Sequence, residues 1–110
     1  MYDSKKTEWI KNRILFVEKT LLSLGCSIVN MPISYKENRP IFEYNHEYYR
    51  IDRISFSGRT FIILEWAETI EKVIHNIMED IDPFPCDLSN EEVIKEIKYA
   101  LQIESYPSDY

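Results

Sequence analysis

Glycine is scarce in this sequence: the 110 residues include only Gly25 and Gly58. The phosphate-binding loops of P-loop and dinucleotide-binding proteins place two or three glycines within one short loop, because the backbone must approach phosphate closely. The chain contains neither pattern. The standard nucleotide-binding loops are therefore excluded.

Cysteine is equally scarce, with Cys26 and Cys86 separated by 60 positions. No two cysteines, and no cysteine and histidine, have the spacing of a zinc site. We predict two reduced and buried thiols, as is usual without a secretion signal, and a disulfide between them stays open as the alternative.

Long apolar runs are also missing. No stretch approaches the roughly 20 apolar residues of a transmembrane helix. The start of the chain, residues 1–6, leads into an amphipathic segment rather than the apolar region of a signal peptide. We therefore expect a cytoplasmic protein.

The length and composition are those of one globular domain, residues 1–110. Hydrophobic residues make up 45% of the chain and charged residues 29%, which differs from the composition of disordered proteins. The net charge is −6, but it is unevenly distributed: residues 1–64 carry ten basic and seven acidic residues, and residues 65–110 carry three and twelve. Such a field repels nucleic acid and attracts a basic partner.

Hydrophobic periodicity predicts the first half of the fold. Apolar residues recur every three or four positions from Ile10 to Leu24, which predicts a helix over Ser4–Leu24 that ends at Gly25. Four short apolar runs predict strands over residues 26–30, 41–44, 48–56 and 60–66, joined by turns at 45–46 and 57–59. The alternation slips between Arg53 and Ile54, which predicts a bulge in the third strand.

Two helices are predicted after the strands. The second covers residues 68–80 and ends at the Asp82–Pro85 segment, and the third covers residues 89–101, where Ser89 and Glu92 have capping-box spacing. The fold class is therefore α+β, with an N-terminal helix, a four-stranded antiparallel meander and two C-terminal helices. The polar face of the second helix is acidic, whereas membrane-surface helices use lysine and arginine, so we expect no membrane binding.

The sequence contains few residues that could form a catalytic site. Cys86 and His75 form the one cysteine–histidine pair to consider, and we interpret them as an inert thiol and an exposed histidine. Asp80 and Asp82 match two ligand positions of a calcium-binding loop, but Phe84 does not match the next one. We therefore predict no metal, no cofactor and no enzymatic activity. A small enzyme that uses these carboxylates remains a less favoured alternative.

Polar residues also alternate along the third predicted strand. Tyr48, Arg50 and Asp52 share one face of it. We interpret them as cross-strand pairs on a solvated face, with a recognition strip as the alternative.

The acidic second half of the chain also contains aromatic residues, which anchor interfaces while acids supply steering and specificity. The alternative is a solvated acidic face above aromatic residues that belong to the core. The residues predicted to bind a partner are Glu79, Asp80, Asp82, Asp87 and Glu91 through their charge, and Trp66, Phe84 and Tyr99 as anchors. Tyr106 and Tyr110 belong to the same aromatic set.

About fifty residues of the chain resemble the small immunity proteins of bacterial polymorphic-toxin and contact-dependent inhibition systems. The resemblance rests on the strand at residues 61–67, the segments 73–80 and 82–88, and the final helix that ends in Tyr99-Ala100-Leu101. It implies an often acidic cytosolic protein that binds a cognate toxin domain tightly and frequently blocks a nuclease. No contact residue is implied, because these proteins differ in where they bind.

The leading hypothesis is therefore a non-enzymatic immunity protein that binds and neutralises a basic bacterial toxin domain, possibly a nuclease, through an acidic surface. The alternative is an adaptor or regulatory domain that forms a homodimer through an exposed strand edge or the first helix. A concentration-dependent mass would favour the alternative.

Overall fold

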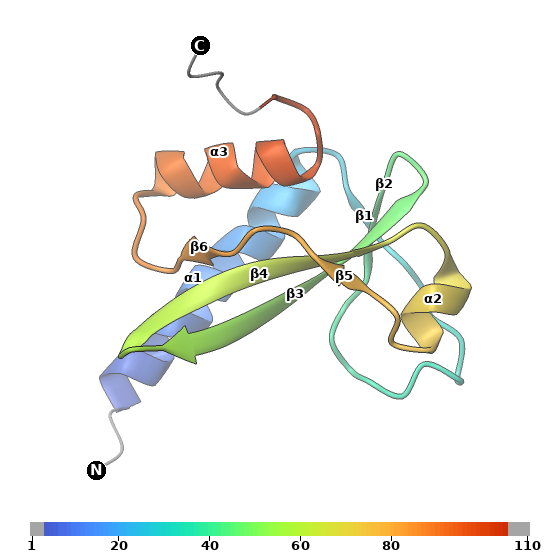
Figure 1. Cartoon of the computed structure of the whole chain (residues 1–110), viewed down its shortest axis with the longest axis horizontal. Helices are drawn as coiled ribbons and strands as arrows, with labels where there is room; N and C mark the ends of the chain where they lie inside the picture. The colour runs from blue at the N-terminus through green and yellow to red at the C-terminus, as the bar shows by residue number, and fades with distance from the viewer. Residues whose placement is uncertain (1–3, 106–110) are drawn as a thin grey trace.

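The computed structural model describes residues 4–105 of the chain (Figure 1). Its elements are α1 (Ser4–Ser23), β1 (Ser27–Ile28), β2 (Phe42–Tyr44), β3 (Glu47–Phe56), β4 (Arg59–Ala67), α2 (Ile70–Ile74), β5 (Glu79–Asp80), β6 (Phe84–Pro85) and α3 (Asn90–Ala100). The strands form one antiparallel sheet in the order β1-β2-β3-β4-β5, and β6 pairs with β4 alongside β5. The predicted α+β class is confirmed, but the sheet has six strands rather than four.

Tight turns join β2 to β3 and β3 to β4, as predicted. Asn45 and His46 have φ values of 54° and 64°, and Ser57 and Gly58 have values of 52° and 78°. Two successive left-handed residues define a turn whose twist matches that of a β-hairpin. Asparagine and glycine adopt this conformation at low cost.

The predicted bulge in β3 is wrong. The pairing of β3 with β4 is unbroken from Tyr48 opposite Ala67 to Phe56 opposite Arg59. The apolar alternation slips for another reason: Ile54 and Phe56 lie on the outer face of the hairpin, where they are 44% and 71% exposed.

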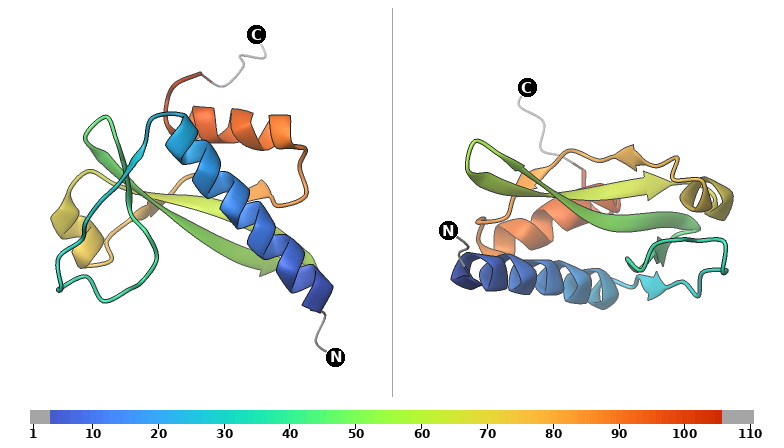
Figure 2. Two further views of the ribbon diagram at one scale, coloured as in Figure 1. Left: turned by 180° about the vertical axis from the view of Figure 1, so that it is seen from behind. Right: turned by 90° about the horizontal axis from the view of Figure 1, so that it is seen from below.

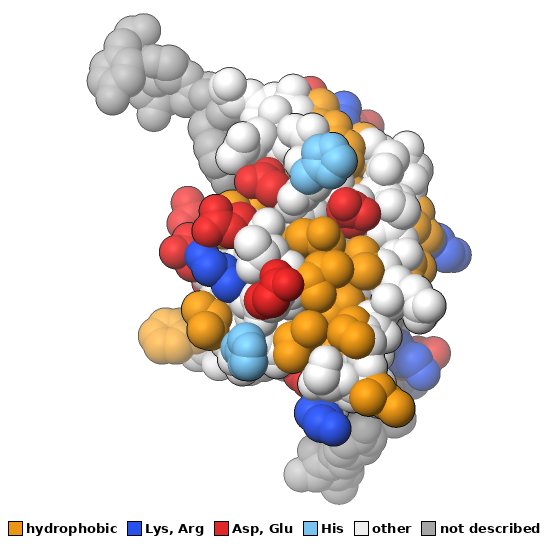
Figure 3. Space-filling model, turned by 90° about the vertical axis from the view of Figure 1, so that its right-hand side faces the viewer, with side chains coloured by type: hydrophobic (Ala, Val, Ile, Leu, Met, Phe, Trp, Pro, Cys, Tyr) orange, Lys and Arg blue, Asp and Glu red, His pale blue; other side chains and the backbone are white. Residues whose placement is uncertain are grey.

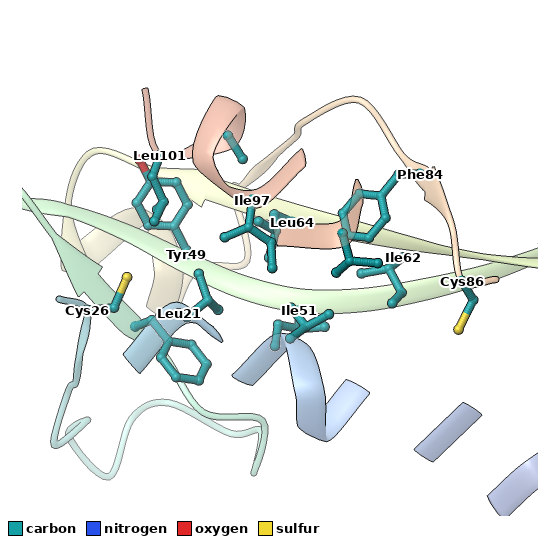
Figure 4. Packing of buried hydrophobic residues seen from close by; sticks show 14 of the residues in the cluster. Leu21, Cys26, Tyr49, Ile51, Ile62, Leu64, Phe84, Cys86, Ile97 and Leu101 are labelled. Carbon is teal, nitrogen blue, oxygen red and sulfur yellow. The ribbon is translucent and has the colours of Figure 1, made fainter. Parts of the chain in front are cut away.

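Both long helices cover the same face of the sheet (Figure 2). Tyr49 and Ile51 of β3 and Ile62 and Leu64 of β4 point toward the helices and form part of the main core (Figure 4). Its best-buried members include Tyr49 and Leu64 from the sheet, Val17 and Leu21 from α1, and Val93 and Ile97 from α3. β4 is central, with β3 on one side and β5 and β6 on the other, as its apolar sequence predicts.

The loop between β1 and β2 and the short helix α2 cover part of the opposite face. Ile41, Ala67 and Val73 form a second buried cluster there. Figure 3 shows the side of the molecule that carries this region, with hydrophobic side chains at its centre and both histidines nearby. The sheet is therefore apolar on both faces near β2.

The second helix is much shorter than predicted. It begins after the N-cap Thr69, whose side chain accepts a hydrogen bond from the Lys72 amide (3.2 Å), and it ends at Ile74 instead of residue 80. Asn76 is left-handed (φ 58°), and the amide of Ile77 bonds back to the carbonyl of Lys72 (2.8 Å). This Schellman motif stops the helix and sends the chain toward β4.

The first and last helices match their predicted ranges closely. Gly25, after α1, has a φ of 107°, and α3 begins with the predicted capping box between Ser89 and Glu92. No helix in residues 4–105 is long and apolar enough to cross a membrane. Cys26 and Cys86 are both free and buried in different parts of the core (Figure 4), which confirms the prediction of two reduced thiols.

Candidate functional site

A groove of about 690 Å³ lies between the sheet and the C-terminal end of α3. Trp66 and Tyr99, two of the predicted anchors, line it together and are both half-buried. Tyr49, Ile81, Gln102 and Glu104 complete most of the lining. The fold thus brings together aromatic residues that lie 33 positions apart in the sequence.

The sheet positions the floor of the groove. Tyr49 on β3 is the register partner of Trp66 on β4, and Glu79 on β5 is the partner of Trp66 on the other side. Side chains that face each other across antiparallel strands lie on the same face, so Glu79 stands beside Trp66 on the groove side. Asp80 is the partner of Glu65 and lies on the opposite face.

The end of α3 forms the other wall. Gln102 is left-handed (φ 62°), and the amide of Ile103 bonds back to the carbonyl of Lys98 (2.9 Å). This second Schellman motif turns the chain and brings Glu104 to the groove, where its carboxylate lies 3.6 Å from the Lys98 ammonium.

A neutral phenol lies at the base of the groove. The Tyr49 hydroxyl donates a 3.5 Å hydrogen bond to the half-buried carboxylate of Glu47. Burial, and then the negative charge of Glu47, raise the pKa of Tyr49 far above its ordinary range. Tyr49 therefore stays protonated and adds an aromatic ring to the site without a charge.

The predicted acids fall into two separated groups. Glu79 and Asp80 are exposed near the groove end of β4, and Asp82 is exposed beside the middle of that strand. None of the three forms a salt bridge shorter than 4.0 Å within residues 4–105, although Glu79 interacts electrostatically with Lys72. Asp87 lies beyond β6 at the other end, where it is paired with Arg59 (3.1 Å). The two ends of β4 are roughly 26 Å apart at 3.3 Å per residue. Glu91 is exposed in the first turn of α3.

A bulge holds Asp82 out from the sheet. β4 has two residues between Ile62 and Glu65, whereas the partner segment has three between Asp80 and Phe84, so one residue is extra. The charge of Asp82 then acts on Glu96 of α3: burial first, and then Asp82 and Glu92, raise the pKa of Glu96. Sequence analysis missed Glu96, although Glu92 and Glu96 have the four-residue spacing of one helix face.

Phe84 is not available as an anchor. Its side chain is 4% exposed and packs in the main core, because β6 pairs with β4 and turns the ring inward. The prediction of Phe84 as a surface anchor is therefore wrong. Tyr106 and Tyr110 lie outside the described residues.

The possible nucleophile and base are not together. Cys86 is buried beside the Thr60 end of β4, and burial raises the pKa of its thiol. His75 is exposed at the C-terminus of α2, which lies toward the other end of β4. Within residues 4–105, no three histidine, cysteine or acidic side chains are arranged to hold a metal ion.

The face of Tyr48, Arg50 and Asp52 is not solvated as interpreted. Arg50 is 1% exposed and forms hydrogen bonds to Glu65 (2.7 and 3.0 Å), Glu37 (2.6 Å) and Asn76 (2.7 Å). The network ties the loop before β2 and the end of α2 to the sheet. These residues form a buried polar cluster that holds the loop and α2 against the sheet. In the sequence, polar residues at every second position of a strand look the same whether that face is buried or solvated.

Comparison with known proteins gives no family for this chain. No protein-family model matches it. No curated protein and no solved structure matches it either.

Proposed function

We propose that the protein is a non-enzymatic immunity protein that binds and neutralises a basic bacterial toxin domain, and that the groove beside β5 is its docking site. The observation that carries the proposal is the meeting of Trp66 and Tyr99 in one groove beside the exposed Glu79. Aromatic side chains supply buried contact area at an interface, and unpaired acids supply charge complementarity.

The charge distribution supports a basic partner. Residues 65–110 carry twelve acidic and three basic residues, and this segment contributes β5, α3 and most of the groove. A toxin that binds nucleic acid needs a basic surface for phosphate. An acidic inhibitor is steered to that surface and blocks it by occupancy, without chemistry of its own.

The proposal predicts a local electrostatic effect in binding kinetics. The toxin domain is first isolated by capture on the tagged protein at low salt and identified by mass spectrometry. The double variant Glu79→Lys/Asp80→Lys then associates with it at least tenfold more slowly, and raising the salt slows association of the unmodified protein more than its dissociation.

The matched control is Glu8→Lys/Glu71→Lys, which has the same net charge but changes exposed acids on α1 and α2 that are not among the predicted binding residues. A smaller effect of the control supports the groove end as the docking site. Equal slowing by both variants shows a general charge effect and contradicts the assignment of this face.

The homodimer alternative is supported by a different surface. Ile54 and Phe56 are exposed side by side near the tip of the β3–β4 hairpin, and β2 pairs with β3 only at residues 47–49. The remaining β3 edge can accept another strand. A mass that rises with concentration and returns to that of the monomer in Phe56→Ser would support this alternative, and a constant monomer mass contradicts it.

A further inference from the structure

The groove has the composition of a site for an organic cation. Two of its walls are aromatic rings, from the half-buried Trp66 and Tyr99, and the buried ring of Tyr49 closes its base. The negative face of an aromatic ring attracts a cation, and the attraction increases when water is excluded. Tyr49 is buried and stays neutral, so the π-surfaces that the groove offers are those of Trp66 and Tyr99.

Three carboxylates lie near these rings. Glu104 lines the groove, Glu47 accepts the hydrogen bond of the Tyr49 hydroxyl, and Glu79 stands beside Trp66 across the β4–β5 pair. No lysine or arginine in residues 4–105 lines the groove. Lys98 reaches Glu104 at 3.6 Å, and Lys72 interacts electrostatically with Glu79 from outside the groove.

We infer that this groove binds the guanidinium group of an arginine side chain that the protein partner presents. The inference rests on the proposed function and names what its docking site recognises. A planar guanidinium stacks on an aromatic ring and donates paired hydrogen bonds to a carboxylate. Glu104 is the acceptor in the groove, and the arginine replaces Lys98 as its partner.

Arginine fits the site better than lysine or an apolar side chain. An ammonium group is strongly hydrated and compact, so it gains less from a groove walled by the two rings of Trp66 and Tyr99. An apolar side chain would leave the carboxylates around the groove without a new partner and would gain nothing from their charge. An arginine side chain can both stack on the aromatic rings and pair with a carboxylate.

The two tryptophans of the chain allow a direct test by NMR. Trp66 lines the groove, whereas Trp9 lies exposed on α1, so their indole N–H resonances report on the site and on an internal reference. The Trp9→Phe variant assigns the two signals. The probe is N-acetyl-arginine methylamide, and its neutral isostere N-acetyl-citrulline methylamide is the matched ligand control.

We expect the arginine probe to shift the Trp66 resonance saturably at millimolar concentration and to leave Trp9 unchanged. Tyr99→Leu and Glu104→Gln each weaken binding by roughly threefold or more, whereas Tyr99→Phe preserves it. Lys98→Met strengthens binding, because it frees Glu104. Glu104 is exposed and Lys98 is half-buried, and neither belongs to the hydrophobic core, so the test does not depend on the Tyr99 variant folding.

The inference is overturned by equal shifts with arginine and citrulline, by tighter binding of the corresponding lysine probe, or by a response that does not saturate. These results leave the proposed function standing if the captured toxin domain binds the unmodified protein and associates more slowly with Glu79→Lys/Asp80→Lys. If no toxin domain binds but the arginine probe binds as expected, the proposed function is contradicted and the cation site is retained.

Discussion

Arg50 and Glu65 face each other across β3 and β4 and form a bidentate ion pair beneath the loop that precedes β2. The contacts are 2.7 Å from Nε to Oε1 and 3.0 Å from Nη2 to Oε2. Hydrogen bonds to Glu65 outweigh the effect of burial and raise the pKa of Arg50 above its ordinary value, so the charge persists in the folded protein.

Breaking this pair should be costly and non-additive. Arg50→Met or Glu65→Leu alone leaves a buried charge with reduced compensation and should lower the free energy of unfolding by about 3 kcal/mol. The double variant removes both charges and should cost at least about 1 kcal/mol less than the sum of the single variants. Urea denaturation measures all three, and additive losses would show that the two side chains do not act as a pair.

Asn76 combines a backbone role with a side-chain role, and two substitutions separate them. Its φ of 58° ends α2, and its Oδ1 accepts a 2.7 Å bond from Arg50. Asn76→Gly keeps the turn and loses the bond, at a cost of about 1.5 kcal/mol, since the donor is charged. Asn76→Ala should cost about 1 kcal/mol more, because alanine tolerates the left-handed region poorly. Equal stabilities of the two variants in urea would contradict the backbone role.

Glu96 should make stability depend on pH in the direction opposite to most acids. Its folded pKa is raised above the ordinary value of 4.5 by burial, Asp82 and Glu92, so the folded state holds the proton more tightly than the unfolded state. Its contribution therefore favours folding at low pH and is lost as the pH rises from about 4.5 through the folded pKa.

The variant Glu96→Gln should consequently be more stable than the unmodified protein at pH 7 and lose that advantage at pH 4. Thermal unfolding at both values measures the change, with Glu91→Gln as a control on the same helix. An advantage of Glu96→Gln that is equally large at pH 4 would point to packing rather than charge.

Both cysteines should be unreactive in the folded protein. Burial raises the pKa of Cys26 to about 11 and raises that of Cys86 as well, so at pH 8 both remain thiols. An aromatic disulfide reagent should release its chromophore slowly from the native chain and release two equivalents promptly in guanidinium. One fast equivalent under native conditions would show that one thiol is accessible.

The features that sequence analysis predicted depend on neighbouring residues. α1, α3 and the two hairpin turns follow from apolar periodicity, the Ser89–Glu92 cap and the Asn45 and Gly58 turns. The features that it missed depend on distant contacts. Ile77, Met78 and Ile81 have helical spacing, yet the free edge of β4 recruits their segment as a strand once Asn76 has ended α2.

The candidate site was only partly predictable, because it also depends on contacts between residues that are distant in the sequence. Aromatic and acidic residues in the second half of the chain indicated a binding surface, but only the antiparallel register sets Trp66 beside Glu79 and turns Phe84 inward. The meeting of Trp66 with Tyr99 depends on how α3 packs on the sheet. Likewise, the burial of Arg50 depends on the loop that covers it.

The most direct test of the central claim is the growth of bacteria that express the captured toxin domain. We predict that the domain alone stops growth, that coexpression of the unmodified protein restores it, and that Glu79→Lys/Asp80→Lys restores it much less while Glu8→Lys/Glu71→Lys protects fully. Undiminished growth with the domain alone, or equal protection by both double variants, would contradict the account of a toxin neutralised through this groove.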